Sequence, residues 1–229
     1  MNRRSLLLGS GAAVVAVAGY GAWAGFGGNQ VVDLGATLID PAQAQTTSDA
    51  PLDLSRVEEM VLGNPDAAVT VMEFASYTCP HCANFHQTVF QELKRDYIDT
   101  GLIRFVYREV YFDAYGLWAS LVARCGGPMR YFGISSILYE EQAEWSRAAD
   151  GAAVAENLRR IGRRAGMSDE QMNTCLADRD LAMAMMQVYQ NGVTEFGVQG
   201  TPSFVINGEL HSNMSFDEFK AILDPLLGR

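Results

Sequence analysis

The sequence predicts an α/β domain that an inserted block of helices divides into two parts. Two strand-like segments flank a helix-like one between residues 69 and 107, strand patterns stop at residue 113, and they return after residue 200. Of the 229 residues 48% are hydrophobic and 19% are charged, so the chain can bury a core and global disorder is excluded.

The N-terminus predicts export from the cytoplasm. Residues 1–4 form a short basic segment that contains Arg3 and Arg4, and residues 6–26 after it include no charged residue. Residues 42–44 offer a small-x-small cleavage site, and cleavage at residues 22–24 or retention as a membrane anchor are the alternatives. The arginine pair resembles a twin-arginine signal, and an ordinary signal with two arginines is the alternative. We predict an export signal and possible anchor over residues 1–44 and a linker over 45–56.

A β-α-β unit is expected next. Residues 69–74 are rich in β-branched residues and predict a buried strand. A helix should follow, with Pro80 in its first turn and Gly101 after its end. Residues 103–107 predict the next strand, which completes the unit. The helix shows apolar residues at three- and four-residue spacing, namely Cys82, Phe85, Val89, Leu93 and Tyr97.

Residues 113–196 predict several short helices. This stretch is rich in Ala, Arg, Glu and Met, and glycines interrupt it. Ser168 followed by Gln171 predicts a capping box at the start of one helix.

The C-terminal part returns to a β pattern. Residues 203–206 and 209–211 flank an Asn-Gly pair, which predicts a hairpin with a type I′ turn. Ser215 and Glu218 predict a capping box for a final helix.

Charge and cysteine content limit the function. The 17 basic and 27 acidic residues give a formal net charge of −10, which argues against a nucleic-acid-binding protein. Four cysteines suffice for one redox pair and one structural disulfide. In an exported protein we expect Cys125 and Cys175 to form that structural disulfide, and two separate buried thiols are the alternative.

The strongest chemical motif is the segment Cys79-Pro80-His81-Cys82, at a junction of strand and helix. The free N–H groups and the dipole of a helix N-terminus favour a thiolate, so the pKa of Cys79 should be lowered. His81 can add positive charge or a hydrogen bond, and Pro80 shapes the turn. The spacing lets Cys79 attack a disulfide and lets Cys82 resolve the mixed disulfide.

Metal and haem interpretations of the motif are weaker. A zinc site would need two further ligands, for which only His81 and His86 are nearby, and no second C-x-x-C or H-x₃₋₅-H pair exists. Covalent haem attachment would need histidine at position 83, where Ala83 stands. We therefore expect no metal and no cofactor.

Residues 71–82 resemble the active-site strand and helix of DsbA-like thiol-disulfide oxidoreductases, which are members of the thioredoxin superfamily. Residues 200–204 are similar to the cis-proline loop of that family, and the helical insertion also matches. The resemblance covers about residues 57–227. It implies a thioredoxin-like fold with an inserted all-helical domain, in which residues 57–112 and 197–229 form the thioredoxin-like domain and residues 113–196 form the insertion.

The resemblance also implies roles for individual residues. Cys79 would be the exposed nucleophile and Cys82 its buried partner, with Thr201, Pro202 and Pro80 at the substrate. Glu73 would be a buried acid that helps proton movement at Cys82, and a solvent-facing glutamate on an edge strand is the alternative. Many DsbA proteins carry valine where Thr201 stands, and isomerases carry threonine, which weakens a pure oxidase role.

The function implied is a periplasmic enzyme that donates its Cys79–Cys82 disulfide to newly exported proteins. A DsbB-like membrane partner would re-oxidise it. A disulfide isomerase or reductase is the first alternative, although the stretch before Val57 is too short for a dimerisation domain, and we expect a monomer. A chaperone that binds metal through Cys79, Cys82 and nearby methionines or histidines is the alternative from another class.

Overall fold

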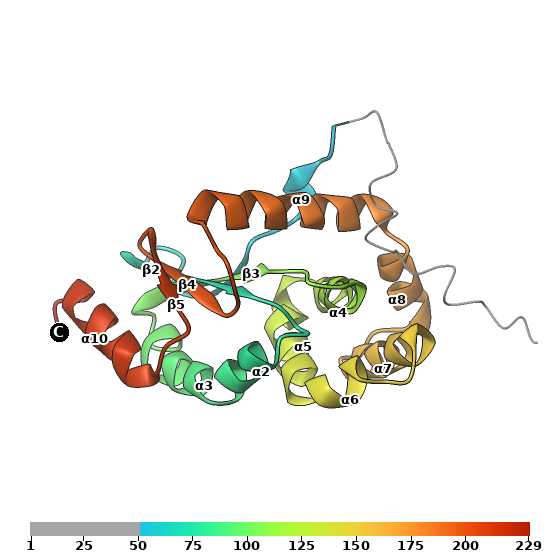
Figure 1. Cartoon of the computed structure of the whole chain (residues 1–229), viewed down its shortest axis with the longest axis horizontal. Helices are drawn as coiled ribbons and strands as arrows, with labels where there is room; N and C mark the ends of the chain where they lie inside the picture. The colour runs from blue at the N-terminus through green and yellow to red at the C-terminus, as the bar shows by residue number, and fades with distance from the viewer. Residues whose placement is uncertain (1–50) are drawn as a thin grey trace, which may run out of the picture. The chain divides into compact units, whose positions relative to one another are not determined.

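A five-stranded mixed sheet carries the fold (Figure 1). The structure is a computed structural model that describes residues 51–229, so the predicted export signal and most of the predicted linker lie outside the described residues. The strand order is β1-β3-β2-β4-β5, in which β2 and β3 are parallel and the other neighbours are antiparallel. The strands are β1 Met60–Gly63, β2 Val69–Ala75, β3 Ile103–Glu109, β4 Ser203–Ile206 and β5 Glu209–Ser212.

The strands predicted from β-branched composition are present, whereas β1 has no counterpart among the predicted strands. It is four residues long and has a single fully buried residue, Met60, so its sequence carries little period-2 pattern. Its pairing with β3 makes it a strand. The β4–β5 hairpin turns at Asn207 and Gly208, and both have the positive φ that a type I′ turn requires.

The helix expected after β2 is broken into three pieces. They are α2 Pro80–Gln87, α3 Val89–Leu93 and η2 Lys94–Ile98, a short π-helical segment. The break lies at Thr88, whose φ of −123° and ψ of −88° are not helical and whose hydroxyl donates to the carbonyl of Asn84. The apolar spacing predicted the buried face correctly but could not show this interruption.

Helices cover both faces of the sheet. Figure 1 shows α2, α3 and α10 (Phe216–Leu226) on one face and α9 (Arg179–Phe196) on the other. The Ser215–Glu218 capping box at α10 is complete. Five more helices lie between β3 and α9: α4 Ala114–Cys125, α5 Pro128–Glu140, α6 Gln142–Ser146, α7 Gly151–Arg164 and α8 Asp169–Leu176.

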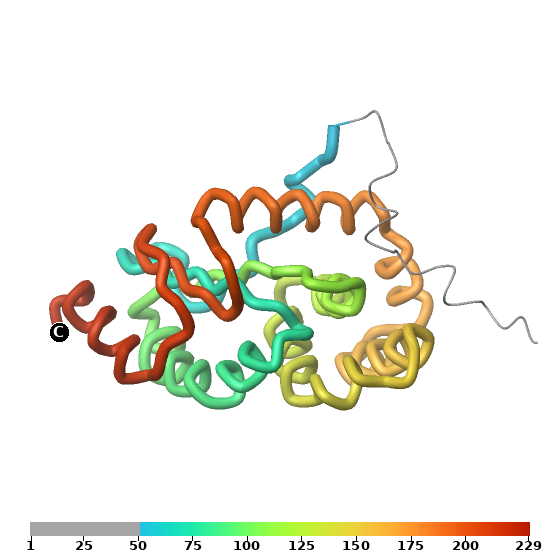
Figure 2. Tube along the Cα trace, in the orientation of Figure 1, coloured from blue at the N-terminus to red at the C-terminus, as the bar shows by residue number. Residues whose placement is uncertain are grey.

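Together with α9, these helices fill the stretch between β3 and β4 for which the sequence predicted an insertion over residues 113–196. Figure 2 shows the chain leaving the sheet after β3 and returning through α9 to β4. A disulfide joins Cys125 at the end of α4 to Cys175 in α8, with 5.7 Å between the Cα atoms. The Ser168 hydroxyl caps α8, but the Gln171 side chain bonds the carbonyl of Cys125, so the capping box predicted there is half formed.

Within residues 51–229, no helix is both long enough and apolar enough to cross a membrane. Side chains of the sheet and of the insertion belong to one continuous buried core, which includes Val71 and Trp145. The insertion therefore shares a buried core with the sheet and can position residues beside the end of β2.

Candidate active site

Cys79 lies where β2 gives way to α2. It is the N-cap residue of α2, with an extended backbone, and Pro80 occupies the first turn as predicted. Its N–H donates to the carbonyl of Ser76 and its carbonyl accepts the N–H of Ala83, which fixes the turn. Cys79 and Cys82 are free thiols in the structure, and the Cys79 side chain is 8% exposed while that of Cys82 is fully buried.

The environment lowers the pKa of the Cys79 thiol from 9.0 to about 5. The hydrogen bond from the Cys82 thiol is the largest cause, and the Thr201 side chain and the backbone N–H groups of Cys82 and His81 add to it. Burial of the sulfur opposes these effects. The helix N-terminus therefore contributes as predicted, but His81 acts through its backbone N–H and its side chain is exposed.

The pKa of Cys82 moves in the opposite direction. Burial raises it first, and the hydrogen bond to Cys79 and the negative charge of Glu73 raise it further. At neutral pH the reduced site thus holds a thiolate at Cys79 and a thiol at Cys82.

The loop before β4 lies against the Cys79 sulfur. The Thr201–Pro202 peptide is cis, and the Cys79 sulfur lies 3.4 Å from the carbonyl oxygen of Thr201, to which the thiol donates when it is protonated. The Thr201 hydroxyl is buried and makes no hydrogen bond within the described part of the chain, so it is free to donate to a thiolate. The structure thus brings together the two motifs that lie 122 residues apart, with Pro202 buried and Pro80 exposed.

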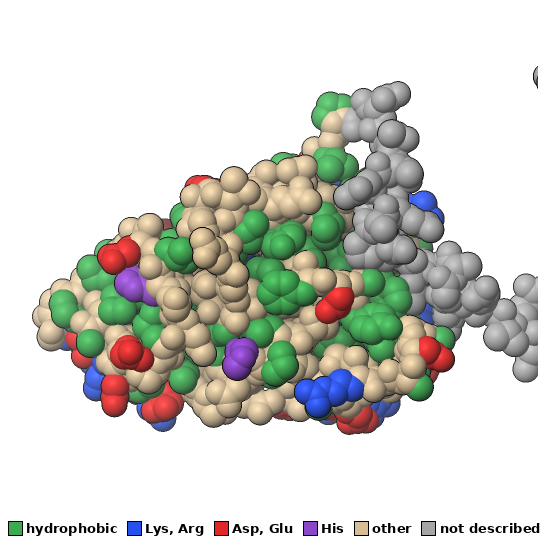
Figure 3. Space-filling view, in the orientation of Figure 1, with side chains coloured by type: hydrophobic (Ala, Val, Ile, Leu, Met, Phe, Trp, Pro, Cys, Tyr) green, Lys and Arg blue, Asp and Glu red, His purple; other side chains and the backbone are tan. Residues whose placement is uncertain are grey.

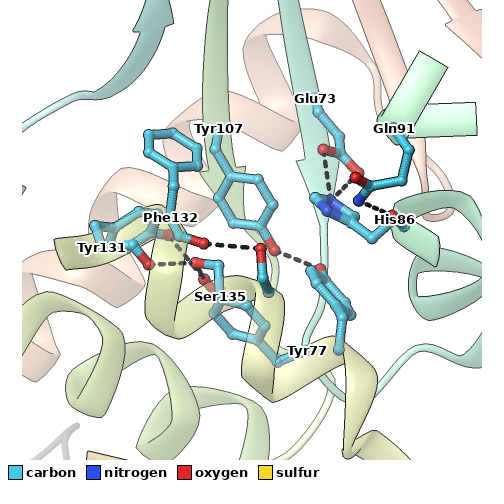
Figure 4. A network of polar contacts seen from close by, with 10 residues as sticks. Glu73, Tyr77, His86, Gln91, Tyr107, Tyr131, Phe132 and Ser135 are labelled. Atoms are coloured by element: carbon cyan, nitrogen blue, oxygen red, sulfur yellow. Dashed lines mark hydrogen bonds and ion pairs between the residues drawn. The ribbon is translucent and has the colours of Figure 1, made fainter. Parts of the chain in front are cut away.

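Glu73 is fully buried, so the interpretation as a solvent-facing edge glutamate is wrong. β2 lies between β3 and β4 and is not an edge strand. The Nε2 atom of His86 lies 2.9 Å and 3.1 Å from the two carboxylate oxygens of Glu73 (Figure 4). Sequence reasoning considered His86 only as a zinc ligand, although its place four residues after Cys82 put it on the same buried helix face.

Comparisons with known proteins show the family to which the chain belongs. A family model described as Thioredoxin matches residues 55–225. The chain belongs to the thioredoxin family. Among solved structures, alpha-DsbA1 of Wolbachia pipientis superimposes with a TM-score of 0.70 and 25% identity, over 75% of this chain and 92% of that one. The chain is a DsbA-like member of the family, and the predicted fold class is confirmed.

Two relatives are informative by name. A Rickettsia bellii protein named "Putative protein-disulfide oxidoreductase" is 38% identical over 168 residues, which are 72% of this chain and 63% of the relative. Disulfide bond formation protein D of Bacillus subtilis is 25% identical over 173 residues, 72% of this chain and 75% of the relative. This thioredoxin-family chain thus spans less than two thirds of the length of the rickettsial relative.

Residues of the helical insertion fix the active-site turn of this DsbA-like protein, and no sequence pattern marked them. The side-chain amide of Gln142 donates to the carbonyls of Tyr77 and Cys79, over 2.7 Å and 2.9 Å. The Thr78 hydroxyl donates to Asp113, 2.8 Å away, which also caps α4.

A buried tyrosine network continues from the turn into α5 (Figure 4). The Tyr77 hydroxyl bonds Tyr131 (3.1 Å) and Ser135 (2.6 Å), and Tyr131 donates to Glu109, which pairs with Arg124. Burial raises the pKa of both tyrosines, so they stay neutral at physiological pH and act as hydrogen-bonding groups.

Metal binding gains no support from the side-chain arrangement. Among the described residues, no three His, Cys, Asp or Glu side chains are placed so that they could hold a metal ion. The geometry instead suits thiol chemistry. The pKa of Cys79 is lowered and Thr201 lies beside its sulfur, while Cys82 is buried and is affected by the charge of Glu73.

Proposed function

We propose that this protein is a thiol-disulfide oxidoreductase that donates its Cys79–Cys82 disulfide to reduced proteins outside the cytoplasm. The opposite pKa shifts of the two cysteines carry the proposal, because a Cys79 thiolate is a stable leaving group and the buried Cys82 is protected from substrate. The names of the rickettsial and Bacillus relatives support it.

The reaction follows from the accessibility of the two sulfurs. A substrate thiolate attacks the Cys79 sulfur, the Cys79–Cys82 bond breaks, and Cys82 leaves and takes up a proton. A second substrate thiolate then attacks the substrate sulfur of the mixed disulfide and expels the Cys79 thiolate. The substrate loses two electrons to form its disulfide, and the two cysteines gain them.

The substrate would lie along the Thr201 loop. The Thr201 carbonyl already faces the Cys79 sulfur, and Pro202 and Pro80 flank the same place. Figure 3 shows apolar side chains gathered on the face of the molecule in view, below α9. Phe112, which is 59% exposed, adjoins the Asp113 that holds Thr78, so apolar surface lies beside the turn and suits an unfolded chain.

The sequence and the family resemblance support a compartment and a partner for the proposed reaction. Residues 1–44 would direct export to the periplasm, by the twin-arginine or the general route, with cleavage or retention as an anchor. A DsbB-like membrane protein would take two electrons from the reduced pair and restore the disulfide. Thr201 favours an isomerase or reductase as the second candidate.

The test is oxidation of a reduced, unfolded model protein by the purified, oxidised chain. Wild type should introduce disulfides, Cys79→Ser should be inactive, and Cys82→Ser should accumulate mixed disulfides through Cys79. The Cys125→Ala/Cys175→Ala variant is the control and should remain active. Equilibration of the Cys79–Cys82 pair against glutathione separates the candidates. At the same ratio of reduced to oxidised glutathione, the cysteine pair of an oxidase is in the dithiol form, whereas that of a reductase is in the disulfide form.

A further inference from the structure

His86 links the buried active-site acid to the protein surface. Its side chain is 6% exposed and lies one helical turn after Cys82 on α2, so both side chains share the buried face of that helix. One ring nitrogen faces both oxygens of Glu73. The ring stacks on Tyr139 of α5, with 4.2 Å between centroids and 17° between planes, which fixes its orientation.

A pocket of about 250 Å³ lies between α2, α3 and α5 and reaches this ring. His86 and Tyr139 are its buried residues, while its exposed ones, Gln87, Gln91 and Glu140, are polar. Gln91 donates to the carbonyl of His86, and Gln87 donates to that of Tyr139, so both glutamines support the walls. His86 is thus in contact with Glu73 on the inside and with the pocket on the outside.

The proposed reaction requires a proton to move at a sulfur that solvent does not reach. Cys82 must gain a proton when it is expelled and lose one when it attacks, and its side chain is fully buried. Glu73 is equally buried, so it needs a second group to exchange protons with solvent. Imidazole can accept a proton at one nitrogen and release one from the other.

We propose that His86 relays the proton of Cys82 between Glu73 and the surface pocket. This inference rests on the proposed thiol-disulfide exchange and names the positioning residue that acts through Glu73. Within the described part of the chain, the titratable groups near His86 besides Glu73 are Cys82 one turn earlier on α2, Tyr107 on β3, Tyr139 on α5 and Glu140 at the rim of the pocket. Burial raises the pKa of both tyrosines, so neither competes for the proton at neutral pH.

The relay can be measured on single steps. The reduced protein is mixed with an aromatic disulfide that releases one coloured thiolate when Cys79 attacks it and a second when Cys82 attacks the mixed disulfide. The second step forms the Cys79–Cys82 bond, breaks the mixed disulfide and releases the Cys82 proton. Its rate is followed from about pH 5 to about pH 9.

His86→Gln is the decisive variant, because the glutamine amide still donates to Glu73 but does not take up a proton. We expect the second step to slow by about tenfold or more and to lose its dependence on pH in the neutral range, while the first step is unchanged. In His86→Ala the second step should slow by the same factor. Imidazole added to the solution should restore the rate of that step, because the pocket leads to the place that the ring has left. His211→Ala, the matched control on β5, should behave as wild type.

Two results would overturn the relay. A His86→Gln variant with a wild-type second step would show that His86 only neutralises or holds Glu73. An equal slowing of both steps would place the effect on the fold or on Cys79. If wild type fails to oxidise protein substrates while His86→Gln still slows only the second step, the proposed function fails and the relay stands.

Discussion

The side-chain amide of Gln142 donates a 2.9 Å hydrogen bond to the main-chain carbonyl of Cys79. Gln142 is the first residue of α6 and belongs to the helical insertion, whereas Cys79 is the N-cap residue of α2, just after β2. The insertion therefore contacts the reactive turn directly, and a second bond to the carbonyl of Tyr77 holds the turn at another point.

We expect Gln142→Ala to destabilise the protein. The substitution removes the donor that Gln142 gives to the buried carbonyl of Tyr77, at a cost of about 1–3 kcal/mol if water does not replace it, whereas the carbonyl of Cys79 keeps its bond from the N–H of Ala83. Denaturant unfolding measures the loss, and Gln190→Ala, an exposed glutamine on α9, is the control. A midpoint equal to that of the control would show that the turn does not depend on Gln142.

The sequence predicted most of the fold because its strands and helix faces follow local patterns. β2, β3 and the β4–β5 hairpin have β-branched composition or an Asn-Gly turn, and Cys79 is marked by its C-x-x-C motif. Gln142 and Asp113 could not be predicted, since their roles depend on how the insertion packs against the sheet. β1 escaped prediction for the same reason, because its pairing with β3 decides its conformation.

The reactivity of Cys79 should follow a pKa of about 5. We expect the rate of alkylation of the reduced protein to rise through a midpoint near that pH and to stay level to neutral pH, because the thiolate is the nucleophile. Peptide mapping after short exposure to iodoacetamide should find Cys79 labelled and Cys82 unlabelled. A midpoint near 9, the ordinary value for a thiol, or faster labelling of Cys82 would contradict the assignment.

Cys82→Ala should raise the pKa of Cys79. The hydrogen bond from the Cys82 thiol is the largest cause of the lowering, and alanine removes it without adding another donor. The alkylation midpoint should move upward while the protein stays folded. An unmoved midpoint would assign the lowering to the helix N-terminus and Thr201 and not to the Cys82 thiol.

Thr201→Val should raise the pKa of Cys79 by a smaller amount. Valine keeps the shape of threonine but removes the buried hydroxyl that can donate to the thiolate. A less stable thiolate makes the disulfide a weaker oxidant, which is opposite to the direction that the family resemblance suggests for valine here. The alkylation midpoint and the glutathione equilibrium measure both effects, with the exposed Thr194→Val on α9 as the control. An unchanged midpoint would show that the hydroxyl does not reach the sulfur.

Reduction of Cys79–Cys82 should stabilise the folded protein, which is the reverse of the effect of an ordinary disulfide. The hydrogen bonds and the helix N-terminus that favour the Cys79 thiolate exist only in the folded state, and DsbA is itself an established example of a thiol whose pKa is lowered in this way. Between pH 5 and pH 9 the unfolded chain keeps the Cys79 proton and the folded protein does not, so the free energy of unfolding of the reduced form rises by about 1.4 kcal/mol for each pH unit. The gain is lost as the pH falls through 5. Above pH 9 the unfolded chain ionises both thiols while folded Cys82 keeps its proton, so stability declines again.

The measurement needs a background without the second disulfide. Cys125–Cys175 closes a loop of 50 residues, and its reduction should destabilise the protein by about 4 kcal/mol, which would mask the effect at the active site. Denaturant midpoints of the oxidised and reduced Cys125→Ala/Cys175→Ala variant, taken at about pH 4 and about pH 7, isolate the Cys79–Cys82 pair. The reduced form should have the higher midpoint at neutral pH, and the difference should shrink or reverse in acid. A higher midpoint for the oxidised form at neutral pH would indicate a reductase-like site, because the folded state of a reductase is more stable with the disulfide formed than with the two thiols reduced.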